Sequence, residues 1–197
     1  TVPPASADQY LNFTPGIGAI KECNQGIDAA SGDFILMTGT DVIAPAHWDT
    51  ELLRLFDERK DCGVAALSAF EPNATIGPRE ALDLTVEGMF SPFMMFRKGW
   101  RWSEDYERVY QDSDLVLRMY EAGLRAYRSC RAHVWHLGSV TNTSVNKAAH
   151  ERALARDEAL FYRKWGGSPL AMFGMIRADQ QVYAREHEAW TAQIHRH

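Results

Sequence analysis

Apolar residues recur along the chain in two alternating spacings, which predict helices and strands in turn. Between residues 16 and 30 they follow the three-to-four spacing of one helix face, and Ser31-Gly32-Asp33 ends that helix. Residues 34–37 are an unbroken apolar run, which suits a strand buried on both faces of a parallel sheet. An amphipathic helix around 48–56 and a strand at 64–67 continue the alternation.

The second half of the chain repeats this alternation with more interruptions. Several Pro and Gly residues mark 70–88 as a long surface excursion. Gly123 is predicted to end a helix that carries acidic residues in its first turn. That helix spans 112–122. The same spacings also predict a strand over 90–96, strands around 126–128 and 133–135, and outer helices over 146–165 and about 176–194.

Strands that alternate with helices predict an α/β domain with a mixed, mostly parallel sheet flanked by helices. We place this domain at residues 1–145 and interpret 146–197 as a C-terminal helical extension packed on the same domain. Ligands of such domains usually bind beyond the carboxyl ends of the strands. Asp41 follows the 34–37 strand and would lie there, and the segments before Asp112 and after Trp135 could converge on the same crevice.

Composition narrows the class of protein. A chain of 197 residues fits one domain with a real core, and its net charge of -5, with scattered basic residues, argues against a nucleic-acid partner. No stretch approaches the roughly 20 apolar residues of a membrane span. Three cysteines at irregular spacing indicate neither a disulfide framework nor a CxxC metal site, so we expect a soluble protein of the reducing cytoplasm. The first residues lack the pattern of a signal peptide.

Four sequence blocks, in this order, resemble the family 2 glycosyltransferases, which have the GT-A fold. Together they cover roughly residues 16–140. The blocks are Gly16 to Met37 with Asp41-Val42 and Trp48; Ser91 to Lys98, similar to an acceptor-side strand; Gln111 to Arg118 with Ala122-Gly123, similar to an acidic catalytic helix; and Val134 to Ser139, similar to the segment of a late metal-binding histidine.

The resemblance implies transfer of a sugar, with inversion, from a nucleoside-diphosphate sugar to a saccharide or other hydroxyl acceptor, as in polysaccharide biosynthesis. Mn²⁺ or Mg²⁺ would offset charge on the departing diphosphate. It assigns Asp41 to the cation and the donor, His136 to the cation with His133 as fallback, and Asp112 to the general base. The usual Asp-x-Asp or Asn-Asp-Asp motif is reduced to its last residue, since Gly39-Thr40 precedes Asp41.

Each of these assignments has a plain structural alternative: Asp41 would simply cap the turn after its strand, and His136 would be an ordinary core or surface histidine. Lys21 and Asn24 lie in the helix that, by resemblance, runs under the nucleotide-sugar. Lys21 there can meet a phosphate as a point charge, but a helix Lys is commonly just exposed, and the role of Asn24 is equally open. Asp112 and Asp114 also suit the N-terminal turn of a helix, where the macrodipole stabilises acids. We assign Asp114 mainly to that role, with Arg118 four residues on as its ion-pair partner.

Alternative functions remain open for the whole chain. Nothing before Gly16 matches the strand-helix-strand unit with which the family begins. The chain is therefore a fragment, is completed by a partner chain or a second copy, or is a degenerate relative. A non-catalytic sugar-binding or assembly module is the second hypothesis, and a metal-dependent hydrolase using Asp41, Asp112 and His136 is the third.

Overall fold

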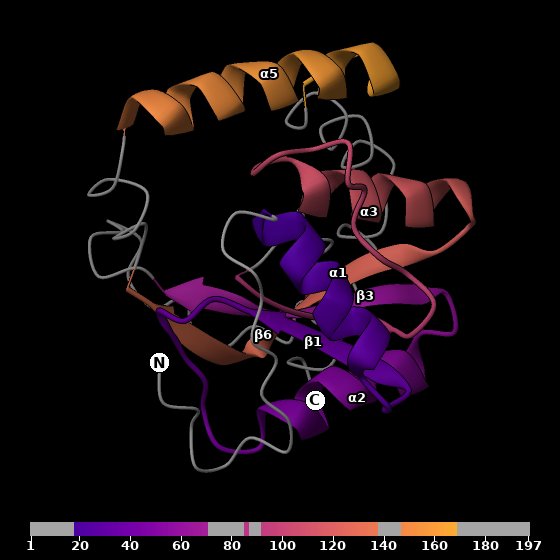
Figure 1. Ribbon diagram of the computed structural model, residues 1–197. Coiled ribbons are helices and arrows are strands. Elements are labelled where there is room, and N and C mark those ends of the chain that lie inside the picture. The colour runs from indigo at the N-terminus through magenta and orange to yellow at the C-terminus, as the bar shows by residue number, and fades with distance from the viewer. Residues whose placement is uncertain (1–17, 71–84, 87–91, 138–146, 169–197) are drawn as a thin grey trace, which may run out of the picture.

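A six-stranded mixed sheet forms the centre of the fold, with helices on both faces (Figure 1). The computed structural model describes residues 18–70, 85–86, 92–137 and 147–168. The elements in these ranges are α1 (Ala19–Ala29), β1 (Phe34–Thr38), β2 (Val42–Ile43), α2 (Trp48–Glu58), β3 (Cys62–Phe70), β4 (Thr85–Val86), β5 (Phe93–Arg97), α3 (Gln111–Glu121), β6 (Arg125–His136) and α5 (Lys147–Trp165).

The strands follow the order β1-β5-β3-β6-β2, and β4 also pairs with β6. Of the pairings described, β3 with β6 is parallel, whereas β1–β5, β3–β5, β2–β6 and β4–β6 are antiparallel. The α/β class is confirmed, but the prediction of a mostly parallel sheet is wrong for this part of the chain. A strand buried on both faces is apolar throughout whichever way its neighbour runs, so its sequence does not reveal direction.

Two hydrophobic cores sandwich the sheet. On one side α1 and α3 cover it, and on the other side α2 does (Figure 1). Successive residues of β5 point alternately into the two cores, with Met95 on the α2 side and Phe96 on the α3 side. This burial on both faces explains the unbroken apolar runs in the central strands.

The end of α3 is set by Gly123, as the sequence predicts. Gly123 has φ 82°, a left-handed conformation that costs a glycine little. The N–H of Gly123 donates to the carbonyl of Tyr120 at 3.0 Å, and the N–H of Leu124 donates to that of Met119 at 2.9 Å. These bonds satisfy the last carbonyls of the helix and turn the chain into β6.

Gly63 lets β3 approach the end of α3 closely. A Cβ atom at residue 63 would lie 2.9 Å from Leu124 Cβ and 3.1 Å from Met119 Sδ. We expect Gly63→Ala to lower the free energy of unfolding by about 1–3 kcal/mol, because the added methyl group overpacks this contact. Urea unfolding measures the loss. Gly26→Ala is the control, since a Cβ there meets nothing within 4 Å and should stabilise α1 by about 0.5–1 kcal/mol. Equal effects of both changes would contradict the close approach.

The last described element, α5, lies outside α3 on the side away from the sheet (Figure 1). Its Phe161 is fully buried in the core that α1 and α3 share, and Leu160 and Trp165 pack against that core. The boundary at 145/146 stays a prediction. No helix in the described ranges is both long and apolar enough to cross a bilayer.

Some predicted elements differ from those observed. The two short strands at 126–128 and 133–135 are one strand, β6, while β2 was not predicted. Part of the predicted excursion at 70–88 forms β4, and β3 extends to Phe70. The rest of the excursion, the predicted helix at about 176–194 and the segment before Gly18 lie outside the described residues.

Candidate functional site

Asp41 and His136 lie side by side although they are far apart in the chain. His136 Nε2 is 3.3 Å from Asp41 Oδ2, and the two side chains are 17% and 30% exposed. The short strand β2 brings them together, because it pairs antiparallel with β6 and sets Val42 opposite His136. The N–H of Leu137 also donates to the carbonyl of Asp41 at 2.9 Å. The site thus keeps a carboxylate and an imidazole within reach of solvent.

Gly39 makes room for the Asp41 carboxylate. A Cβ atom at residue 39 would lie only 2.6 Å from Asp41 Oδ1, so this oxygen occupies space beside the glycine. The backbone of Gly39 is tied to the start of β5, since its N–H donates to the carbonyl of Pro92 at 3.1 Å. The absent side chain at 39 therefore favours the conformation in which Asp41 meets His136.

The Asp41–His136 pair fits part of a cation site. Carboxylate oxygen and imidazole nitrogen both suit Mn²⁺, and Mg²⁺ is commonly held by one or two carboxylates together with phosphates and waters. Within the described ranges, no group of three His, Cys, Asp or Glu side chains is placed to hold a metal. Two protein ligands would leave the other coordination positions to a bound diphosphate or to water.

His133, the fallback candidate, does not belong to this pair. It lies three positions before His136 on β6, and strand side chains alternate between faces, so the two imidazoles point to opposite sides of the sheet. Burial lowers the pKa of His133, which favours its neutral form. The histidine at this site is therefore His136.

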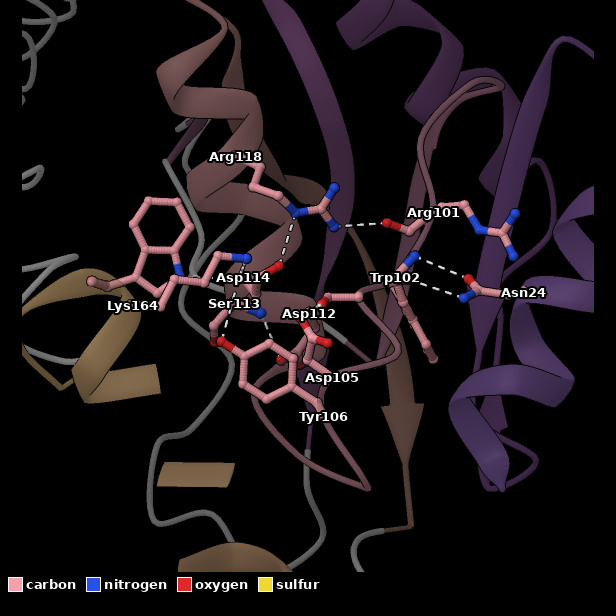
Figure 2. Close-up of polar contacts among 12 residues, drawn as sticks. Asn24, Arg101, Trp102, Asp105, Tyr106, Asp112, Ser113, Asp114, Arg118 and Lys164 are labelled. Carbon is pink, nitrogen blue, oxygen red and sulfur yellow. Dashed lines mark hydrogen bonds and ion pairs between the residues drawn. The ribbon is translucent and has the colours of Figure 1, made fainter. Parts of the chain in front are cut away.

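Asp112 lies in the first turn of α3 and belongs to a second group of residues (Figure 2). The N–H of Ser113 donates to Asp112 Oδ1 at 2.7 Å. Burial raises the pKa of Asp112 above that of an ordinary aspartate, and the Ser113 N–H opposes part of this rise. A partly buried carboxylate of this kind is a stronger proton acceptor than an exposed one.

Tyr110, just before α3, has a strained backbone. Its φ of 66° lies in the left-handed region, and only His47 shares this among the non-glycine residues that the structure describes. Such a conformation costs a bulky residue about 1–2 kcal/mol and is often found at functional sites. The carbonyl of Tyr110 accepts the N–H of Asp114 at 2.8 Å, the first bond of the helix that carries Asp112. The sequence contains no signal for this strain.

Asp114 is fully buried and accepts bonds from α3, from α5 and from the loop between β5 and α3 (Figure 2). Arg118 Nε lies 2.8 Å from Oδ2, which confirms the predicted pairing along α3. Oδ1 is 2.7 Å from Lys164 Nζ and 3.0 Å from Trp165 Nε1, both at the end of α5. The hydroxyl of Tyr106 lies 3.3 Å from the same oxygen. Asp114 therefore joins α3 to α5, and the sequence did not reveal the contacts with α5.

Asn24 is a structural residue in this fold. Its side chain is fully buried, donates to the carbonyl of Trp102 and to Glu104 Oε1, and accepts the N–H of Trp102, each at 3.0 Å (Figure 2). Every polar atom of the amide is thus used to hold the loop after β5, so we leave Asn24 out of the proposed site. Lys21 is exposed on the same helix, and its contact with a phosphate stays a prediction.

Comparisons with known proteins add little to this geometry. No protein-family model matches the chain, and no curated protein matches it. Among solved structures, it is similar to the crystal structure of S. aureus TarS 1-349, with 15% sequence identity and a TM-score of 0.48. The likeness covers 74% of this chain and 52% of that one, so the chain spans about half the length of that structure. The residues themselves must therefore support any function.

Proposed function

We propose that this chain carries the catalytic part of an inverting glycosyltransferase that uses a nucleoside-diphosphate sugar. The observation that carries the proposal is the 3.3 Å approach of His136 to Asp41. The resemblance to family 2 glycosyltransferases assigns these two positions, from separate sequence blocks, to one cation. Asp112, with its raised pKa at the start of α3, supports the role of general base.

In the proposed reaction Asp41 and His136 would hold Mn²⁺ or Mg²⁺. The bound cation would offset the charge that develops on the departing diphosphate. Asp112 would accept the proton of the acceptor hydroxyl as that oxygen attacks the sugar carbon. A single displacement of this kind inverts the configuration at that carbon, and the acceptor would be a saccharide or another hydroxyl compound.

Turnover of a donor panel tests the activity itself. The chain is incubated with UDP-, GDP- and dTDP-sugars in the presence of Mn²⁺, and release of the nucleoside diphosphate is followed with and without saccharide acceptors. We expect release from one nucleotide class, faster when an acceptor is present. No release from any donor would contradict the proposed transfer.

Cation binding can be measured without activity. We expect Asp41→Asn and His136→Ala each to weaken Mn²⁺ binding in the presence of UDP by about tenfold or more, because each change removes one of two protein ligands. Isothermal titration calorimetry gives the affinity. Asp49→Asn is the matched control, since Asp49 is an exposed acid in the first turn of α2. If all three variants bind Mn²⁺ like the unchanged protein, the cation lies elsewhere.

A non-catalytic sugar-binding or assembly module is the second candidate. It is favoured by Gly39, which leaves one carboxylate where the family usually has two, and by Gln111 in place of the usual Glu before Asp112. The side-chain carbonyl of Gln111 is buried and has no hydrogen-bond partner among the residues that the structure describes. A folded protein that binds neither UDP nor Mn²⁺ by calorimetry would favour this module, acting with a second copy or a partner chain.

A further inference from the structure

A buried carboxylate of α5 holds the turn that leads into α3. Asp157 is fully buried, and its oxygens accept the N–H groups of three consecutive residues. The N–H of Glu107 lies 3.0 Å from both oxygens, and those of Arg108 and Val109 lie 2.8 and 3.0 Å from Oδ2. Consecutive N–H groups that converge in this way form an anion-binding nest. Here the anion is a side chain of the same protein, and Arg156 Nη1, 3.0 Å from Oδ1, partly balances its charge.

The turn held by Asp157 ends at the strained residue Tyr110. A residue in the left-handed region keeps that conformation only if its surroundings fix it. Helix α5 supplies two such contacts, the carboxylate on the preceding N–H groups and the ring of Phe161, whose centroid lies 5.5 Å from that of Tyr110. The conformation of the turn is therefore determined by α5 as well as by the turn's own sequence.

A second buried carboxylate also joins α3 and α5, but this one belongs to α3 and its donors belong to α5. Asp114 of α3 accepts from Lys164 and Trp165 of α5, just as Asp157 of α5 accepts from the turn before α3. Asp112 lies between these two anchors, two residues after Tyr110 and two before Asp114. Movement of α5 would thus move the backbone that carries Asp112.

We propose that Asp157 is a positioning residue for Asp112, through which α5 fixes the turn at residues 107–110 and the carboxylate at the start of α3. The reaction that this serves rests on the proposed function, whereas the fixing of Asp112 does not. Asp157 itself is enclosed by backbone N–H groups and has no surface to offer a substrate. Its influence on turnover would therefore act through the orientation of Asp112.

The test compares Asp157→Ala and Asp157→Asn with the exposed neighbour Glu158→Ala as control. Amide hydrogen exchange is followed at residues 107–113, which include the Ser113 N–H bonded to Asp112. Asp157→Ala should speed exchange there by about tenfold or more, while β3 and α2 keep their protection. Asp157→Asn, which keeps one acceptor oxygen, should fall between that variant and the unchanged protein. If Asp157→Ala does not fold, the comparison of Asp157→Asn with the unchanged protein tests the inference.

Kinetics separate positioning from a merely structural role. A displaced base should lower kcat by about tenfold or more with the KM for the donor little changed, since small misplacements of catalytic groups cost rate. Unchanged exchange at Ser113, or faster exchange with an unchanged kcat, would overturn the inference. If the unchanged protein turns over no donor, the proposed function falls, and exchange at Ser113 alone decides whether Asp157 positions Asp112.

Discussion

Asp112→Asn is expected to lower the rate of sugar transfer by about 10²–10⁴-fold, because asparagine cannot accept the proton of the acceptor hydroxyl. The change keeps the shape of the side chain and an oxygen for the Ser113 N–H. Single-turnover and steady-state kinetics with the active donor measure the loss. Asp57→Asn, an exposed position on α2, is the control and should keep full activity. Unchanged turnover by the Asp112 variant would remove the base assignment.

The same substitution is expected to stabilise the fold at neutral pH. The folded-state pKa of Asp112 lies above its unfolded value, so the unfolded chain loses this proton first as the pH rises, and stability is lost between the two pKa values. Asparagine removes that cost, so we expect Asp112→Asn to raise the free energy of unfolding at neutral pH. The difference should shrink as the pH falls below the ordinary aspartate range. Thermal unfolding across a pH series measures this trend.

The raised pKa also predicts the pH dependence of transfer. Asp112 must be ionised to accept a proton, so activity should fall on acidification at a higher pH than for an ordinary aspartate. An acid limb of the kcat profile at the position of an unperturbed carboxylate would indicate that Asp112 is exposed in the working protein.

Asp114→Asn is expected to have the largest effect on stability and to lower the free energy of unfolding by about 3 kcal/mol. The change removes a buried negative charge that pairs with one cation on α3 and another on α5. Arg118 and Lys164 would lose their shared partner, and α5 would lose a main tie to α3. Urea unfolding measures the change. Asp28→Asn is the matched control: its pairing with Arg101, at 3.4 Å, is exposed and should contribute about 0–1 kcal/mol.

These two aspartates make a sharp comparison, since they lie two residues apart on α3. Asp112→Asn should stabilise the protein and slow transfer, whereas Asp114→Asn should destabilise the protein. A loss of less than about 0.5 kcal/mol for Asp114→Asn would place it among ordinary surface substitutions and contradict its role as a buried junction.

Local features could be predicted well from the sequence. The helix spacing predicted α1, α2, α3 and α5 near their observed bounds, and the four-residue separation of Asp114 and Arg118 predicted their ion pair. The stop at Gly123 also follows from one residue. These features depend on neighbours within one or two helical turns, so the nearby residues are enough to specify them.

The partners in the candidate site required more than local pattern. The resemblance to a family linked Asp41 with His136, but their approach depends on β2, a strand too short to predict, pairing with the end of β6. The helix position of Asn24 leaves a ligand contact open, because it does not reveal that a distant loop encloses the side chain.

The sequence by itself determined the helices, their ends, the apolar strands and the types of residue available for chemistry, because each depends on periodicity or on short-range contacts. Only the tertiary structure decided strand direction, the strained turn at Tyr110 and the burial of Asp157 against the residues before α3. The physical reason is that a buried carboxylate or a left-handed residue is stable only when distant segments supply its partners, and those segments meet when the whole sheet and its helices have packed.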